Sequence, residues 1–557
     1  MRRLPAVALT ALALAACARG RAGPPELILT GGRIFTADPA RPWAEALAIR
    51  GSRIVAVGTT GSLRRLAGPR TRMRDVGGRT VIPGLNDAHA HPGPELRGTK
   101  LATATGDGGL LEIARSLAAA ARLRPRGTWL FATVGDRVLD DQRANRFLLD
   151  SIVPDDPVVL ESWSGHTAVL NSATLGALGI GHGTPDPLGG HYGRVPGSGG
   201  GRGGGGGGGG GVLDGRMTEY AWWNARRRLA SAVPDSASRA DFRRFAEAAA
   251  RFGITTVQDM NTALSTARAV ALVRAADLPI RWRVIRFPMT RPEGRDLADT
   301  RSADPHPGGM LDVSGTKYIL DGTPVERGAA MRRPYADREG WHGELDFPPE
   351  TLQAIIREAL VSRDQLMVHA VGDSAIAVLL RSLAAAAPES TWRALRPRIE
   401  HGDFLAPDLL PLARRLGVVV VQNPAHFSIP ELMHRRFAPD VASAAQPLRS
   451  LLAAGFPIAL GSDGPMNPYL NIMLAVAHPM NPAEALSREQ AVLAYTRGSA
   501  YAELAERETG TLAPGMLADL AVLSQDIFTV PLGELPKTES VLTLVGGKAI
   551  YDAGVVQ

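Results

Sequence analysis

Short apolar runs alternate with helix-like segments throughout the middle of the chain. The runs cover residues 81–91, 254–259, 281–286, 315–321, 365–369, 398–401, 418–422 and 457–463. Alternation of this kind is typical of a parallel sheet covered by helices. Eight such units predict an α/β fold with a (β/α)8 TIM-type barrel, and such barrels place their chemistry at the carboxyl ends of the strands.

Both ends of the chain have a different pattern, with short β-rich runs separated by glycine and proline turns. These runs lie at 27–36, 46–58 and 71–76 near the start, and at 518–523 and 541–552 near the end. The texture is typical of small antiparallel sheets. We therefore predict a small β-sandwich domain built from residues 26–82 and 505–557, flanking a barrel domain at 83–504.

About 160 residues separate the first and second predicted barrel strands, far more than an ordinary connection needs. This length predicts an inserted subdomain at about 100–235, which contains a tract of nearly pure glycine at 197–211. Glycine at this density favours a flexible surface loop. A phosphate-binding loop is disfavoured, because no Gly-Lys-Ser/Thr follows the tract.

His89 and His91 end the first barrel run, with one residue between them. Side chains two apart in a strand point to the same side, so both imidazoles can reach one centre. Neutral imidazole is a common ligand of zinc-like cations. A His-x-His pair also arises often by chance, so the rest of the chain has to support this interpretation.

Further candidate ligands stand in or after later barrel runs. Individually they have ordinary explanations, as a strand-edge lysine, core histidines and a turn aspartate. Together they place the right residue types at the same end of several strands, which favours a shared metal site. The candidates are Lys317, His369, His401 and Asp463.

The composition is that of a soluble globular protein, with 45% hydrophobic and 21% charged residues. The 62 basic and 55 acidic residues are interspersed, and we find no basic stripe interleaved with aromatic residues. We therefore expect no nucleic-acid partner and a small-molecule substrate. The oligomeric state stays open.

The first residues combine Met1-Arg-Arg, an apolar stretch at 4–16 and small residues before Cys17. This pattern resembles a bacterial lipoprotein signal, which implies cleavage before Cys17, acylation, and a tether up to residue 25. We expect an exported protein, lipid-anchored in the bacterial cell envelope. An ordinary secretory signal is the alternative. No intramolecular disulfide is possible, since Cys17 is the only cysteine.

Seven stretches in order carry a resemblance to a known family: 81–91, 165–172, 317–322, 369–373, 398–401, 461–465 and 510–523. They resemble the amidohydrolase superfamily, in the branch that contains N-substituted formamide deformylase. The likeness covers nearly everything after the signal. The glycine tract departs from it, because relatives carry a short mixed turn there.

The resemblance implies roles for the candidate residues. It implies that His89 and His91 bind the more buried metal, that His369 and His401 bind a second one, and that Asp463 touches the buried metal and the reactive water. One or two divalent ions are expected, zinc foremost among them.

The resemblance also implies that Lys317 is carboxylated by carbon dioxide and bridges both ions. A cation near a buried lysine lowers its pKa and so favours the neutral amine that attacks carbon dioxide. The resulting carbamate is an anionic ligand with two oxygens.

We expect a metal-dependent amidohydrolase that cleaves a carbon–nitrogen bond other than a peptide bond, in an amide, an N-formyl compound or a cyclic amide. Asp463 is expected to take the proton of the attacking water and return it to the leaving nitrogen. Two alternatives remain: a mononuclear deaminase of an amino-heterocycle, and a non-catalytic binding lipoprotein on the same scaffold.

Substrate-binding residues are less sharply indicated. His166 and His426 lie in segments that the barrel places near its mouth, and either can hydrogen-bond a substrate carbonyl. The tryptophans in these segments are candidates for an apolar pocket or for the core, and three acidic residues are candidates for orienting the ligands. They are Trp163, Trp222 and Trp223, and Asp321, Glu326 and Asp373.

Overall fold

The computed structural model describes residues 23–101, 108–196, 211–300 and 303–557. Cys17 and all but the last residue of the predicted glycine loop lie outside these ranges. Within the described ranges, no helix is both long and apolar enough to cross a membrane. Because Cys17 lies outside the described residues, the lipid anchor stays a prediction.

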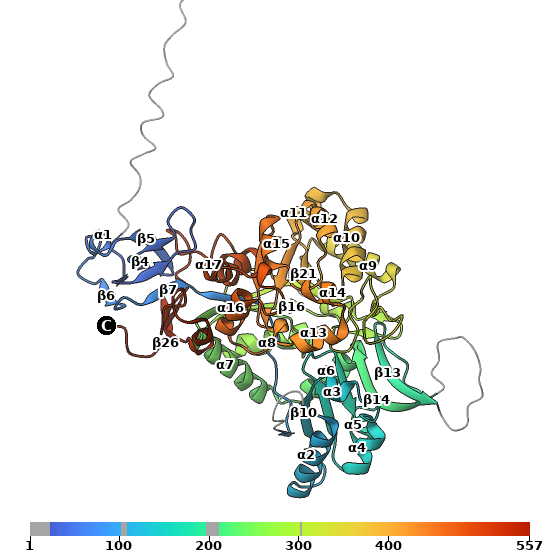
Figure 1. The fold of residues 1–557 in the computed structure, drawn as a ribbon. Coiled ribbons are helices and arrows are strands. Elements are labelled where there is room, and N and C mark those ends of the chain that lie inside the picture. Colours follow the sequence, from blue (N-terminus) through green and yellow to red (C-terminus); the bar gives the residue numbers. More distant parts are fainter. Residues whose placement is uncertain (1–22, 102–107, 197–210, 301–302) are drawn as a thin grey trace, which may run out of the picture.

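A sheet of eight strands forms the centre of the molecule (Figure 1). All the pairings between its neighbouring strands are parallel. In sheet order the strands are β23 (Ile458–Leu460), β22 (Val419–Gln422), β21 (Arg398–His401), β20 (Leu366–Ala370), β19 (Leu311–Ile319), β16 (Arg281–Arg286), β15 (Ile254–Asp259) and β8 (Leu85–Ala90).

The sheet curls into a nearly closed barrel. Its two end strands meet where the Asp463 backbone N–H donates to the carbonyl of His89, at 2.9 Å. This confirms the predicted (β/α)8 barrel, with one difference at the first run. Residues 81–83 belong to a separate strand, β7 (Thr80–Pro83), and the barrel strand starts only after Gly84.

Helices cover the outside of the barrel and bury their apolar faces against it. In α10, for example, Ala375, Ile376, Leu379, Leu380 and Leu383 are buried. The helices are α7 (Asp235–Arg251), α8 (Thr266–Ala276), α9 (Pro349–Ser362), α10 (Asp373–Ala386), α11 (Glu389–Leu395), α12 (Leu410–Leu416), α13 (Pro430–Arg436), α14 (Pro439–Ser443), α15 (Leu448–Ala453), α16 (Pro468–Ala477), α17 (Arg488–Leu493) and α18 (Ser499–Ala502).

Segments from both chain ends form two further sheets that share an apolar core. The first has the order β5 (Arg53–Gly58), β4 (Ala46–Arg50), β1 (Leu27–Thr30), β6 (Arg72–Asp75), with α1 (Thr60–Arg64) beside it. The second has the order β26 (Lys548–Asp552), β25 (Ser540–Val545), β24 (Leu520–Leu523), β7, β2 (Arg33–Phe35), β3 (Trp43–Ala44). The association of the two chain ends is as expected, while the sandwich and the domain boundaries stay predictions.

Gly84 joins β7 to the barrel strand β8. A Cβ atom at this position would lie 2.1 Å from the Oγ1 atom of Thr255 in β15. Only glycine allows the chain to pass so close to β15 where it enters the barrel.

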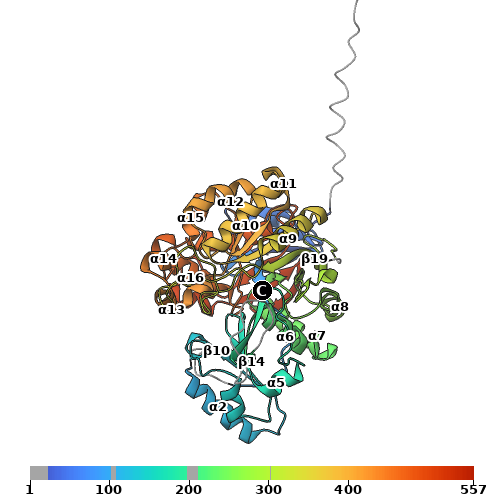
Figure 2. The ribbon, with the colours of Figure 1, turned by 90° about the vertical axis from the view of Figure 1, so that its right-hand side faces the viewer.

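The long segment between β8 and β15 forms the lower body in Figure 2. Its sheet has the order β13 (Gly190–Pro196), β14 (Gly211–Glu219), β12 (Thr167–Leu170), β11 (Val158–Ser162), β10 (Leu130–Val134), β9 (Thr99–Lys100). The accompanying helices are α2 (Leu110–Leu123), α3 (Asp136–Leu139), α4 (Arg146–Ile152) and α5 (Ser172–Ala177), and α6 (Tyr220–Ser231) leads back to the barrel. Strands β13 and β14 pair antiparallel on either side of the glycine tract.

Candidate metal centre

The six predicted ligands converge at one rim of the barrel, with the Asp463 carboxylate among them. Its Oδ1 lies 3.1 Å from His91 Nε2 and 3.6 Å from His89 Nε2. Its Oδ2 lies 3.7 Å from His401 Nδ1. The Lys317 amine lies 3.0 Å from His89 Nε2. Strands far apart in sequence therefore bring these groups within a few ångströms of one another.

His369 completes the cluster, and its ring centroid lies 4.5 Å from that of His401. The side chain is buried, and among the described residues neither ring nitrogen makes a hydrogen bond of ordinary geometry, although the Gly322 backbone lies nearby. An unpartnered buried imidazole is costly unless another species uses its lone pair. This fits a cation beside His369.

Two sets of donor atoms lie close enough to share an ion. His89, His91 and Asp463 offer atoms within 4.8 Å of one another, and so do His401, His426 and Asp463. Imidazole nitrogen and carboxylate oxygen form the donor set that zinc and related divalent ions prefer. The residues therefore fit a divalent metal, although their role as ligands stays a prediction.

Glu400 orients His89 from behind. Its Oε2 lies 2.6 Å from His89 Nδ1, and its Oε1 accepts a 2.7 Å bond from Arg398 Nε. Burial alone would raise the pKa of Glu400, but the charge of Arg398 and the bond from His89 lower it to about 2. The carboxylate thus holds the Nδ1 proton and leaves the Nε2 lone pair toward the cluster.

Burial favours the neutral forms of the basic groups of the cluster. It lowers the pKa of His89 to about 4, with Lys317 adding to the effect. It also lowers the pKa of Lys317 to about 8. A neutral imidazole is the form that binds metal, and a neutral amine is the form that reacts with carbon dioxide.

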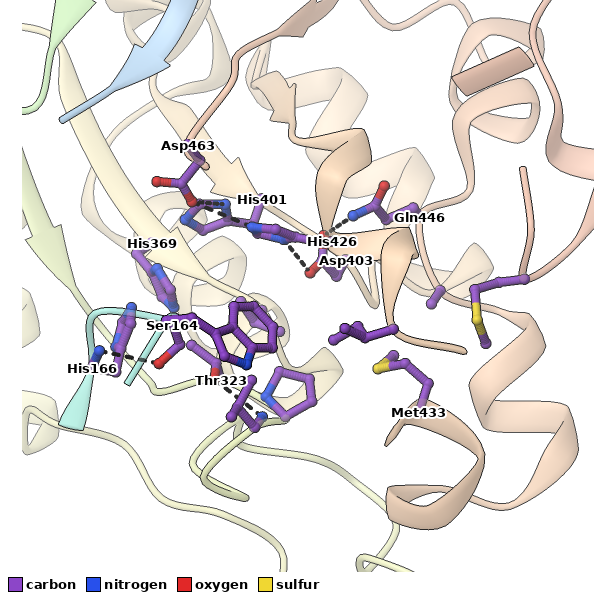
Figure 3. Close-up of a pocket in the computed structure, with 17 residues that line it drawn as sticks. Ser164, His166, Thr323, His369, His401, Asp403, His426, Met433, Gln446 and Asp463 are labelled. Atoms are coloured by element: carbon purple, nitrogen blue, oxygen red, sulfur yellow. Dashed lines mark hydrogen bonds and ion pairs between the residues drawn. The ribbon is translucent and has the colours of Figure 1, made fainter. Parts of the chain in front are cut away.

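His166 and His426, predicted at the mouth, line the cavity beside the cluster (Figure 3). His166 Nδ1 lies 2.7 Å from Glu219 Oε2. His426 lies between two carboxylates, with Nδ1 3.1 Å from Asp403 Oδ2 and Nε2 3.3 Å from Asp463 Oδ2. Burial alone would lower the pKa of His426, but the two carboxylates outweigh it and raise the pKa to about 10.

The three tryptophans have different positions. Trp163 lines both parts of the cavity beside the cluster. Trp223 lines the part near His91, and the centroids of the stacked Trp223 and His91 rings lie 6.4 Å apart. Trp222 is fully buried in the core of the insertion.

The three acidic candidates also differ. Asp321 Oδ1 lies 4.0 Å from His369 Nε2, and Asp321 accepts three backbone N–H bonds that fix its position. Glu326 accepts bonds from Ser162 and Ser164, next to the cavity. Asp373 instead accepts a bond from the Arg332 backbone and contacts no predicted ligand.

A family model described as "Amidohydrolase family" matches residues 72–551. The chain belongs to this amidohydrolase family. Among curated proteins it is 28% identical to Protein LONG AFTER FAR-RED 3 of Arabidopsis thaliana, over 94% of this chain and 91% of that one. It is 26% identical to N-substituted formamide deformylase of Arthrobacter pascens, over 95% of this chain and 98% of that one.

Among solved structures, the amidohydrolase is similar to an uncharacterized metal-dependent hydrolase from Pyrococcus furiosus. The TM-score is 0.65 with 23% identity, over 90% of this chain and 100% of the other. This likeness supports the barrel fold. The family match confirms the predicted superfamily, and with it a hydrolase of carbon–nitrogen bonds.

Several functional contacts of this amidohydrolase were not predicted from its sequence. They involve Glu219 behind His166, Asp403 behind His426, Asn423 behind His401, and the Arg398–Glu400 pair behind His89. One sequence signal was available: strand alternation places Arg398 and Glu400 on one face, opposite Ile399. Two charged residues on the inner face of a barrel strand indicate a buried polar network.

Proposed function

We propose that the protein hydrolyses a non-peptide carbon–nitrogen bond in a small molecule that carries an amide, N-formyl or cyclic amide group. The observation that carries the proposal is the cluster around Asp463, together with the unpartnered ring of buried His369. The relative named N-substituted formamide deformylase supports this class of bond.

His89, His91 and Asp463 would hold one divalent ion, zinc being the expected metal, and His369 and His401 a second one. Lys317 would bridge them as a carbamate, which its pKa of about 8 favours by leaving part of the amine neutral at neutral pH. When bound, such an ion makes water a stronger acid and polarises a substrate carbonyl.

Asp463 is suited to proton transfer by its position and its charge. Burial alone would raise its pKa, but the electrostatic effect of nearby His89 and the bonds from His426 and His91 hold it well below its usual range. The carboxylate faces the cavity, where it can accept the proton of an attacking water and pass it to the leaving nitrogen. His166 and His426 are placed to hydrogen-bond the substrate carbonyl.

Elemental analysis combined with a screen of N-acyl and N-formyl amines tests the function. We expect one or two ions per chain and release of an amine. Asp463→Asn should lower turnover by about 100-fold or more, whereas Asp408→Asn, at an exposed surface site, should not. Near-normal turnover of Asp463→Asn with full metal content would contradict the assigned role.

The same preparation separates the alternatives. Release of ammonia from amino-heterocycles, with activity that survives Lys317→Ala, would identify the mononuclear deaminase. A metal-free, inactive protein would identify a binding protein. For the location, we infer a lipid anchor at Cys17 in the cell envelope, and mass spectrometry of the mature protein should find this cysteine acylated.

A further inference from the structure

Two neighbouring parts of one cavity adjoin the candidate metal centre, one on each side of a shared lining. Both sides share a central set of residues, and each has its own lining beyond it. The shared residues are Trp163, Ser164, His166, His369, His401 and Asp463. A substrate bound with its scissile bond at the cluster therefore has room for one half in each part of the cavity.

One side, which we call the apolar arm, is lined mainly by hydrocarbon and thioether side chains. They are Pro324, Val325, Val371, Ile429, Met433 and Met480. In Figure 3, Met433 lies across the cavity from His369 and His166. The arm's Asp403 is bonded to Gln446 at 2.9 Å and to His426. Because Asp403 is already paired and the rest of this lining is mainly apolar, the arm favours an apolar group. The flexible methionine side chains can adapt to the shape of such a group.

The other side, the polar arm, is lined by Thr133, Glu161 and Arg226. It continues outward to Glu95 and Lys100. Arg226 Nε donates to Glu161 Oε1 at 2.9 Å, and both side chains are 27% exposed. Among the described residues, the Nε bond to Glu161 is the only hydrogen bond of the Arg226 guanidinium. Its Nη groups are available to a hydrogen-bond acceptor on a ligand.

We propose that the substrate is an amide whose two halves differ in polarity: an apolar half held by Met433 and Met480, and a half with a hydrogen-bond acceptor, such as a carboxylate, held by Arg226. This inference rests on the proposed function and specifies its substrate class. Met433 and Arg226 are then the residues that determine specificity on the two sides.

Two matched series of amides test the inference, with the apolar half as the acyl part in one and as the amine part in the other. In one series kcat/KM should rise by about fourfold per added methylene until the arm is full, as expected for burial of apolar surface. A flat or falling dependence in both series would overturn the inference.

Two variants assign the arms. Met433→Gln should abolish the rise in kcat/KM with longer apolar halves, while exposed Met73→Gln should keep that rise. Arg226→Gln should raise KM by about 10-fold or more for substrates with a carboxylate, and not for matched substrates without an acceptor. If each variant affects all substrates equally, the assignment is wrong.

Failure of this inference can be told apart from failure of the proposed function. If metal-loaded protein hydrolyses none of the amides, the function itself is wrong. If it hydrolyses them without regard to the polarity of their halves, only the substrate class is wrong. Calorimetric titration with the apolar product gives a readout independent of turnover, since Met433→Gln should weaken that binding and Met73→Gln should not.

Discussion

Replacing Glu400 by glutamine removes one charge from the support of the candidate metal centre and keeps its shape. Glu400, His89 and Arg398 are fully buried, and the carboxylate bonds to both partners at 2.6 and 2.7 Å. Removing one member of a buried ion pair costs about 3–5 kcal/mol, because the other charge stays buried without compensation.

We expect the lower end of that range. Arg398 keeps two other acceptors, the Ala88 carbonyl at 2.8 Å and Gln258 Oε1 at 2.5 Å. The free energy of unfolding of metal-free Glu400→Gln should therefore fall by about 3 kcal/mol. Metal affinity should fall by about 10–100-fold, because His89 loses the carboxylate that fixes its proton and raises its basicity.

Urea unfolding of metal-free protein measures the first effect, and competition with a chelator measures the second. Glu503→Gln is a matched control: Glu503 is also buried inside the barrel, but it bonds Asn86 and contacts no candidate ligand. It should change metal affinity by less than about twofold, well below the effect of losing a carboxylate that holds a ligand. If both variants bind metal equally well, Glu400 does not support the site.

Three further predictions concern the scaffold. Burial raises the pKa of Glu503 from 4.5 to about 7, so the folded chain binds more protons than the unfolded chain between these values. The stability this provides is full below about pH 4.5 and is lost as the pH rises through about 7, roughly 3 kcal/mol in all. Urea midpoints across this range should vary less in Glu503→Gln, and an unchanged slope would refute the assignment. Arg436, 1% exposed in its side chain, bonds Asp140 of the insertion and Asp337 beside the barrel. Both carboxylates are partly exposed and stay paired with Arg327, so Arg436→Met should lower the free energy of unfolding by about 2 kcal/mol, the value of hydrogen bonds to charged groups, and a loss near zero would show that these bonds do not stabilise the fold. Gly84→Ala should cost about 1–3 kcal/mol by crowding Thr255, and the double variant with Thr255→Ala, which removes both the Oγ1 and the Cγ2 atom, should recover part of this loss if the crowding is real.

Local periodicity was sufficient to predict the barrel and the set of residues that meets at its rim. His89 and His91 are two apart in sequence, and both approach the same oxygen of Asp463, as strand geometry requires. Lys317, His369 and the others needed only the rule that parallel strands bring their carboxyl ends to one edge. These features depend on residue spacing and on the direction of the strands.

The supporting contacts could not be predicted, because they depend on which strands become neighbours and in what register. Glu400 and His89 are 311 positions apart, and the sequence around either residue does not indicate the other as its partner. His166 was placed near the mouth from its segment, but its partner Glu219 was not, because that contact depends on how the insertion folds and packs. Strand alternation can show that Glu400 faces inward, but the residue that it meets is a property of the closed sheet.

The backbone at two of the candidate ligands explains how adjacent residues can both serve the site. In a regular strand Glu400 and His401 would point to opposite faces, yet Glu400 bonds His89 while the His401 ring lies 4.8 Å from the His89 ring.

His401 has a φ of 68°, and Asp463 a φ of 48°. Such values cost a non-glycine residue about 1–3 kcal/mol and persist only where surrounding contacts impose them. The contacts are present: Asn423 holds the His401 ring at 2.9 Å, and the Asp463 backbone bonds to His89 across the closure of the barrel. Positive φ also occurs elsewhere, for example at the helix C-caps Asp277, Arg363 and Arg396, where it ends a helix. His401 and Asp463 cap no helix, and their strained backbone instead brings two predicted ligands to the rim, as expected if function rather than stability determines the conformation there.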